Sequence, residues 1–394
     1  MLLSVTAFSA CVRPVSTSNP TPAVSVSPPP TALLRIEFLK KVAITKDTEG
    51  GGARPEIVAT GDRVFVLYLG DIAAGTSRSF KVKVLDRDLT RTFTSKSLVS
   101  TTTEYGGPTD IRVASDGQYL YAFYETHKPT SAIAGTTYLW GAKYTLNDSF
   151  ERLGHTDTPI ASSKPMVELP DGGELLDDPA PLVGPDSVFV VTRLKYSLST
   201  AGRTAYRVRE FDKDLTTMLR EFDLDLSSAA DGRARVASLL FYKDAIYIAL
   251  ATTVSDQEIN DKNDDGALSD IILVKLRPDW TIDPQEGVWP LASEPGDREN
   301  YVTGLATDGE FFYLAYKQAA GRPPTGEQRA WLRIYGKDFS VVGAETVKSV
   351  AWGPSGGEIR PSLEVSGNRI YSGQSSGQGI GRGNAEIYIY DLTK

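Results

Sequence analysis

The sequence predicts an all-β fold: a six-bladed β-propeller of four-stranded antiparallel blades, closed by an N-terminal strand that completes the last blade. Three observations support this prediction. A hairpin that joins a short apolar strand to an aromatic-rich strand occurs six times along the chain. A second turn, at the end of the third strand, recurs with a similar period. One strand near the N-terminus belongs to no repeat, and the last repeat lacks one strand.

The turn of each recurring hairpin carries an aspartate or an asparagine. Gly-Asp, Asp-Gly and Gly-Asn pairs occur in these turns, and tight hairpins favour such pairs because their central residues need positive φ angles. From one hairpin to the next, the turn residue advances by 54 to 70 residues. The turn residues are Asp62, Asp116, Asp186, Asp244, Asp308 and Asn368.

The third strand of a unit ends in a second turn, which carries an aspartate usually followed by Leu, Trp or Phe. These aspartates are 59 to 66 residues apart, so two independent landmarks share one period. Four antiparallel strands in each unit of about 60 residues are typical of a propeller blade. The aspartates are Asp88, Asp148, Asp214, Asp279 and Asp338.

The two ends of the chain predict how the ring closes. The last unit has three strands, at about 359–365, 368–374 and 384–391, and an unpaired sheet edge is a liability. Residues 33–45 form an extra strand upstream of the first unit, and we expect it to supply the missing outer strand. The alternative, a pair of β-sandwiches, would need neither six equal units nor a displaced first strand.

Composition excludes one large class of function. The 394 residues are 41% hydrophobic and 23% charged, which is typical of a globular protein with a large core. The formal net charge is -8, and the chain has no basic run. Because phosphate binding draws its affinity from clustered Lys and Arg, we expect no nucleic-acid partner.

The sequence offers few ligands for a metal centre or an organic cofactor. Its single cysteine, Cys11, excludes a disulfide framework, and two histidines leave little material for a zinc centre. The glycine-rich stretch at 373–383 lacks the Gly-Lys-Ser/Thr ending of a phosphate-binding loop. We therefore expect neither a nucleotide nor a haem.

Cys11 follows an apolar N-terminal segment, MLLSVTAFSA. This run has the character of a signal-peptide core and is too short to span a bilayer, which takes about 20 residues. The residues Phe8-Ser9-Ala10-Cys11 resemble the lipobox of bacterial lipoproteins, which implies that Cys11 carries a lipid. The alternative is that residues 1–11 form a frayed or buried strand with a chance cysteine.

This resemblance divides the chain into three parts. Residues 1–11 are the expected signal peptide and lipobox. Residues 12–31 are rich in Pro, Ser, Thr and Val, which favours extended conformations, so we expect a tether. Residues 32–394 are the expected propeller. The implied product is an extracytoplasmic lipoprotein, at the cell surface or in the periplasm, that meets the membrane through its lipid anchor only.

Three arginines stand near the starts of innermost strands, on the propeller face where ligand sites usually lie. They are Arg54, Arg235 and Arg360, in blades 1, 4 and 6. A guanidinium group matches a carboxylate in a bidentate manner, so the three could converge on an acidic ligand. The alternative is that each arginine pairs with a carboxylate of an adjacent blade around the central channel.

The starts Arg54-Pro55 and Arg360-Pro361 are similar to those of six-bladed sialidases. In that family an arginine triad holds the substrate acid, and a Tyr-Glu pair acts as the nucleophile. The resemblance implies that Tyr124, Glu125 and Asp110 are the nearest counterparts of the remaining site residues.

An acidic insertion in blade 4 predicts a calcium loop. Asp261, Asn263 and Asp265 stand at alternate positions before Gly266, which is the spacing at which oxygen ligands wrap one calcium ion. Asp270 could supply a further ligand in a shortened loop. Such an ion would order the loop without taking part in catalysis. The alternative is a solvated acidic hairpin tip.

These features leave three hypotheses of function. The first is a non-catalytic surface or periplasmic module that binds a protein or glycan ligand. The second is a glycan-acting hydrolase, similar to a sialidase, at the mouth of the central channel. The third is a structural subunit of an extracellular assembly, in which the chain associates with itself. A common pocket that joins the arginines to an acid would favour the hydrolase.

Overall fold

The computed structural model describes most of residues 34–393. Cys11, the tether and the calcium-loop residues Asp261, Asn263 and Asp265 lie outside the described residues, as does the side chain of Asp270, so these features stay predictions. In the part of the chain that is described, no helix is long and apolar enough to cross a membrane. The described residues are 34–45, 52–70, 78–100, 102, 104–128, 135–156, 158–164, 168–170, 172–194, 204–229, 234–253, 269–283, 287–292, 299–320, 327–351, 361–376 and 384–393.

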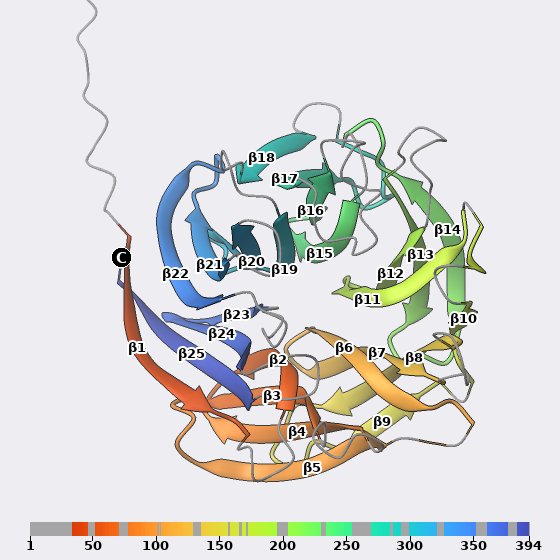
Figure 1. Ribbon diagram of the computed structural model, residues 1–394, viewed down its shortest axis with the longest axis horizontal. Helices are drawn as coiled ribbons and strands as arrows, with labels where there is room; N and C mark the ends of the chain where they lie inside the picture. The colour runs from red at the N-terminus through yellow and green to blue at the C-terminus, as the bar shows by residue number, and fades with distance from the viewer. Residues whose placement is uncertain are drawn as a thin grey trace, which may run out of the picture. The chain divides into compact units, whose positions relative to one another are not determined.

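Six antiparallel sheets follow one another around a common centre (Figure 1). This arrangement confirms the predicted six-bladed propeller. Blades 1 to 3 contain, from the channel outward, β2 (Gly52–Thr60), β3 (Arg63–Gly70), β4 (Ser79–Asp86) and β5 (Thr92–Ser100); β6 (Gly107–Ser115), β7 (Tyr119–His127), β8 (Thr137–Thr145), β9 (Arg152–His155) and β10 (Ala161–Ser163); and β11 (Glu174–Val183), β12 (Ser187–Leu194), β13 (Ala205–Asp212) and β14 (Met218–Asp225). Blades 4 to 6 contain β15 (Ala234–Tyr242), β16 (Ala245–Thr253), β17 (Ser269–Leu276) and β18 (Val288–Ala292); β19 (Glu299–Thr307), β20 (Phe312–Ala320), β21 (Glu327–Tyr335) and β22 (Val341–Ala351); and β23 (Ser362–Ser366), β24 (Arg369–Ser376), β25 (Asn384–Thr393) and β1 (Arg35–Ala43).

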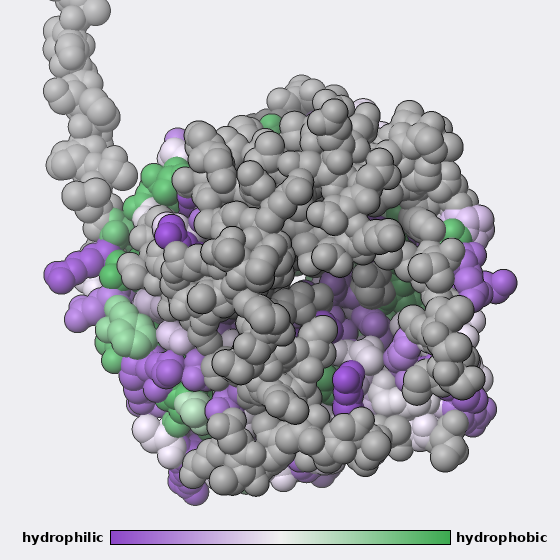
Figure 2. All heavy atoms as spheres, in the orientation of Figure 1, coloured by the Kyte–Doolittle hydropathy of each residue, from purple (hydrophilic) through white to green (hydrophobic). Residues whose placement is uncertain are grey.

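The N-terminal strand closes the ring, as predicted. β1 pairs antiparallel with β25, from Arg35 opposite Thr393 to Ala43 opposite Glu386, with a bulge after Phe38. In Figure 1 the red β1 therefore lies beside the blue β25. The outer side of β1 remains in solvent, and hydrophobic side chains lie among hydrophilic ones at this edge (Figure 2).

One hydrophobic cluster lies between each pair of neighbouring blades. The cluster between blades 1 and 2, for example, joins Phe65 and Phe80 to Tyr124 and Tyr144. Alternate residues of a strand face opposite sides of its sheet, so the middle strands of a blade contribute to two clusters at once. Six such clusters, one for each interface, form the core of the propeller.

The second recurrent turn inserts an apolar residue into these clusters. In blades 1 to 5 that residue follows the turn aspartate and has a φ between 48° and 69°, in the left-handed region. The ring centroid of Phe150 in blade 2 lies 5.7 Å from that of Phe65 in blade 1, and the ring centroid of Trp280 in blade 4 lies 5.1 Å from that of Phe189 in blade 3. Left-handed geometry costs about 1–2 kcal/mol, and burial of a large apolar side chain offsets it. The five residues are Leu89, Phe150, Leu215, Trp280 and Phe339.

The outer strand of blade 2 differs from the prediction of one continuous fourth strand. It is divided into β9 and β10, which pair with different parts of β8. Pro159 lies in the interruption. Because proline has no backbone N–H to donate to the ladder, a continuous strand cannot pass through this position with all its bonds made.

We predict that the N-terminal strand stabilises the ring through Ile44, which directly follows β1. Ile44 is 3% exposed in the cluster between blades 6 and 1, and its N–H donates to the carbonyl of Ala385 at 2.7 Å. Ile44→Ala should lower the free energy of unfolding in urea by about 2–5 kcal/mol. Leu39→Ala is the matched control, because Leu39 is 38% exposed at the bulge of β1. An equal decrease in the free energy of unfolding in the two variants would contradict a stabilising role of Ile44 in ring closure.

Candidate functional site

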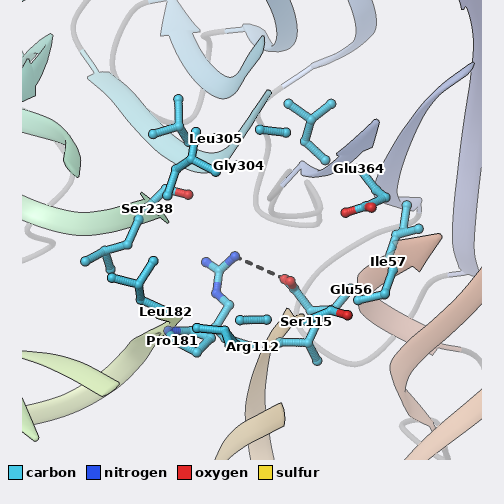
Figure 3. A pocket seen from close by; sticks show the side chains of 18 of the residues that line it. Glu56, Ile57, Arg112, Ser115, Pro181, Leu182, Ser238, Gly304, Leu305 and Glu364 are labelled. Atoms are coloured by element: carbon cyan, nitrogen blue, oxygen red, sulfur yellow. Dashed lines mark hydrogen bonds and ion pairs between the residues drawn. The ribbon is translucent and has the colours of Figure 1, made fainter. Parts of the chain in front are cut away.

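A cavity of about 360 Å³ lies on the propeller axis and is lined by the innermost strands of all six blades. Most of the lining is apolar or backbone, with hydroxyl groups from Ser115, Ser238 and Thr307. Figure 3 shows the guanidinium of Arg112 and the carboxylates of Glu56 and Glu364 turned toward this space. Charged groups that converge on a cavity mark it as the candidate site.

The innermost strands bulge near their first residues, at the mouth of this cavity. The pairing register shifts between Ala53 and Glu56 in β2, between Pro108 and Asp110 in β6, and between residues 175 and 180 in β11. Bulges redirect side chains out of the regular ladder, and they are frequent beside active sites. Arg54 and Asp178, in two of these bulges, have φ angles of 50° and 55°. Such left-handed residues are costly and cluster at functional sites.

Six charged residues from blades 1 to 3 meet beside these bulges, and we call them the mouth cluster; two of them, Glu56 and Arg112, line the cavity. The first contact joins blades 1 and 2, where the Nη1 atom of Arg54 lies 2.8 Å from Oδ2 of Asp110. The same nitrogen donates to the carbonyl of Thr109 at 3.0 Å, and the other oxygen of Asp110 accepts from the N–H of Ile111. The mouth cluster consists of Arg54, Glu56, Asp110, Arg112, Glu125 and Asp178.

Arg112 joins three blades. Its Nη1 atom lies 3.1 Å from Oε1 of Glu56 in blade 1, and its Nη2 atom lies 3.6 Å from Oδ1 of Asp178 in blade 3. The side chains of all three residues are at most 13% exposed. One guanidinium thus holds two carboxylates side by side at the mouth (Figure 3 shows the contact with Glu56).

Glu125 fixes the position of the β11 bulge. This residue lies in β7, the second strand of blade 2, and is 6% exposed. Its Oε1 accepts a hydrogen bond from the backbone N–H of Asp178 at 2.9 Å, and its Oε2 accepts one from the Thr109 hydroxyl at 3.2 Å. The strained backbone of Asp178 is therefore held by a neighbouring blade.

The carboxyl of Glu56 is suited to proton transfer. Burial, together with the negative charges of Asp110 and Asp178, raises its pKa to about 7. Arg112 opposes this shift by its charge and its hydrogen bond. A carboxyl with a pKa close to the working pH can both donate and accept a proton, which is the property of a general acid or base.

Glu364 lies in β23, on the blade 6 side of the same cavity. Burial raises its pKa to about 8, and a hydrogen bond with the backbone of Ala59 opposes the shift. At neutral pH this carboxyl is therefore mostly protonated, so it can donate as well as accept a hydrogen bond.

The structure brings Arg54, Asp110 and Glu125 together, but it separates Tyr124 from them. Neighbouring residues of a strand face opposite sides, so Tyr124 enters the core between blades 1 and 2. It is 3% exposed, and its hydroxyl lies 2.7 Å from Nε2 of His155. Burial also raises the pKa of its hydroxyl, which disfavours the phenolate. A Tyr-Glu pair on β7 therefore does not share one site.

The structure does not describe the side-chain positions of the remaining predicted site residues. The side chains of Arg235 and Arg360 lie outside the described residues, as does the calcium loop. Within the residues whose positions are described, no group of three or more His, Cys, Asp or Glu side chains could hold a metal ion.

Four residues that matter in this geometry received no role from the sequence: Glu56, Arg112, Asp178 and Glu364. Each is a charged residue of an innermost strand, in the segments PEIVAT, DIRVAS, DDPAPLV and PSLEVS. A charge in a strand that neighbours cover on both sides is unexpected unless it faces a cavity. That pattern is the signal by which they could have been found.

We predict that Glu364 makes stability depend on pH. Its pKa rises from an ordinary value near 4.5 to about 8 on folding, so between these values the folded protein holds a proton that the unfolded chain releases. The free energy of unfolding must then fall as pH rises through this window. The melting temperature of Glu364→Gln should equal that of the wild type at pH 5 and exceed it at pH 9. Glu37→Gln, on an exposed position of β1, is the control, and parallel melting curves for all three proteins would contradict the prediction.

No protein-family model and no curated protein sequence matches this chain. Solved structures do resemble it. An α-L-arabinofuranosidase from Fusarium graminearum has a TM-score of 0.57 at 8% identity, over 90% of this chain and 98% of that one. A phage phi92 endosialidase has a TM-score of 0.55 at 10% identity, over 92% of this chain and 70% of the endosialidase chain. A Dyadobacter fermentans protein of unknown function has a TM-score of 0.54 at 12% identity, over 91% and 99%. At these identities the likeness shows a shared propeller fold.

Proposed function

We propose that this protein is a glycan-acting hydrolase that works at the mouth cluster. The observation that carries the proposal is the pair of carboxyl groups on Arg112, namely Glu56 with its pKa of about 7 and Asp178 on its strained bulge. Glycoside hydrolysis needs two such carboxyls, one protonated and one ionised, on either side of the scissile bond.

The environments of the two groups suggest their roles. Glu56 is the general acid, because burial keeps its carboxyl partly protonated at neutral pH and it can give that proton to the leaving oxygen. Asp178 is the second carboxylate, which attacks the sugar or activates a water. Arg112 contacts both, at 3.1 Å from Glu56 and 3.6 Å from Asp178, and so holds the two carboxyl groups in place.

The solved structures that resemble the chain support this proposal at the level of the fold. Two of them are an α-L-arabinofuranosidase and an endosialidase, both of which act on glycans. A fold alone does not establish an activity. The proposal therefore depends on the mouth cluster and not on the resemblance.

We predict that Glu56→Gln lowers kcat/KM on an unactivated glycan by about 10²–10⁴, because the amide cannot donate the proton. Wild-type activity should fall as pH rises above about 7, since the acid is then ionised. An aryl glycoside with a good leaving group needs little proton donation, so on that substrate the variant should keep most of its rate. The measurement is the release of reducing sugar and of the aryl alcohol across pH.

Asp223→Asn is the matched control, because Asp223 lies in the outer strand β14 and pairs with Arg207 away from the channel. A general loss of rate on both substrates in Glu56→Gln would count against an acid role. Binding of a glycan without turnover would remove the hydrolase and favour the binding module expected from the sequence.

We also propose that Cys11 anchors the protein to a bacterial membrane, because the residues before it resemble a lipobox. Cys11→Ala expressed with the native leader should move the protein from the detergent-soluble membrane fraction to the aqueous fraction. The wild-type protein should gain the mass of an attached lipid. Equal partition of the two proteins into the aqueous phase would contradict the anchor.

A further inference from the structure

We infer that the glycan accepted at this site is uncharged, and that sugars with a carboxylate are excluded. The inference rests on the proposed hydrolase, whose substrate class it names. It departs from the acid-binding arginine triad that the resemblance to sialidases implied.

The balance of charge in the mouth cluster carries the inference. Its two guanidinium groups, Arg54 and Arg112, face four carboxyl groups from blades 1 to 3. Like charges placed together at a binding site reject a partner of the same sign. An acidic sugar would add a further negative charge to a cluster that already has more acids than bases.

Both guanidinium groups are also occupied. Arg54 is bound to Asp110 at 2.8 Å, and Arg112 is bound to Glu56 and Asp178 at 3.1 Å and 3.6 Å. A sugar carboxylate could reach either one only by displacing a protein carboxylate. The displaced group would remain nearly buried without its partner, which is costly.

The lining of the cavity is suited to hydroxyl groups. Ser115 and Ser238 supply hydroxyls, and Glu364 supplies a carboxyl that is mostly protonated at neutral pH. These groups both donate and accept hydrogen bonds, as sugar hydroxyls do. The volume of about 360 Å³ lies at the lower end of the range for small-molecule sites, which fits a short stretch of glycan.

The charge of the whole chain acts in the same direction. The formal net charge of -8 repels a polyanionic glycan at long range and has no such effect on a neutral one. Added salt screens this long-range repulsion and leaves the occupied guanidinium groups unchanged. Discrimination against acidic sugars should therefore persist in high salt.

The test compares neutral and acidic glycosides. Two pairs of 4-nitrophenyl glycosides differ only at C6, where a carboxylate replaces the hydroxymethyl group: glucoside with glucuronide, and galactoside with galacturonide. An arabinofuranoside and a sialoside serve as an unmatched neutral probe and an unmatched acidic probe. We expect turnover of at least one neutral glycoside, with kcat/KM about a hundredfold or more above that of its acidic partner. The ratio should hold at low and high salt, and Asp223→Asn should show the same ratio as the wild type.

Binding of the same pairs to Glu56→Gln, measured by calorimetry, separates the inference from the proposed function. If the wild type binds neutral sugars but does not turn them over, the proposed hydrolase activity is wrong and the inferred preference for uncharged glycans stands. Equal or better turnover of the acidic members would overturn the inference and keep the hydrolase, and loss of that turnover in Arg360→Ala would assign it to an arginine site. Neither turnover nor binding of any pair would overturn both.

Discussion

Burial between blades is the constraint on which the rest of this structure depends. A four-stranded blade has two apolar faces, and only its neighbours can cover them. The six interfacial clusters satisfy this requirement only if the ring closes, which β1 achieves by pairing with β25. The same requirement explains the left-handed residues of the second turn, such as Phe150 and Trp280, whose side chains enter the core shared with the preceding blade. The strained backbone of these turns is offset by the apolar burial that completes each interface between blades.

This packing also decides where polar chemistry can lie. The faces of the innermost strands pack against adjacent blades, so few side chains reach the channel, among them Glu56, Arg112 and Glu364. Three carboxyl groups of the mouth cluster are each paired with a guanidinium group of another blade. Arg112 is the partner of Glu56 and Asp178, and Arg54 is the partner of Asp110. The site is therefore a property of three blades together, and no single repeat contains it.

The distinction between repeat and ring explains what the sequence predicted and what it did not. The hairpin turns at Asp62 and Asn368 and the closing strand follow from short-range chemistry and strand counting, and the structure confirms the fold built on them. Arg112 could not be assigned from spacing, because the direction of a side chain near a bulge depends on a register that the sequence does not state. Tyr124 and Glu125 are neighbours in the chain, and for that reason they face opposite sides of the blade.

The channel carboxyls connect stability to chemistry. Removing Glu364 and Glu56 from water disfavours their charged forms, and in both cases burial is the largest cause of the raised pKa. For stability alone, uncharged side chains would serve better at these positions. A protein keeps such groups where a proton held near neutral pH is useful. Arg112 separates the two cases, because it holds Glu56 close to the pKa at which a carboxyl can give up its proton, whereas for Glu364 only a backbone hydrogen bond opposes the effect of burial.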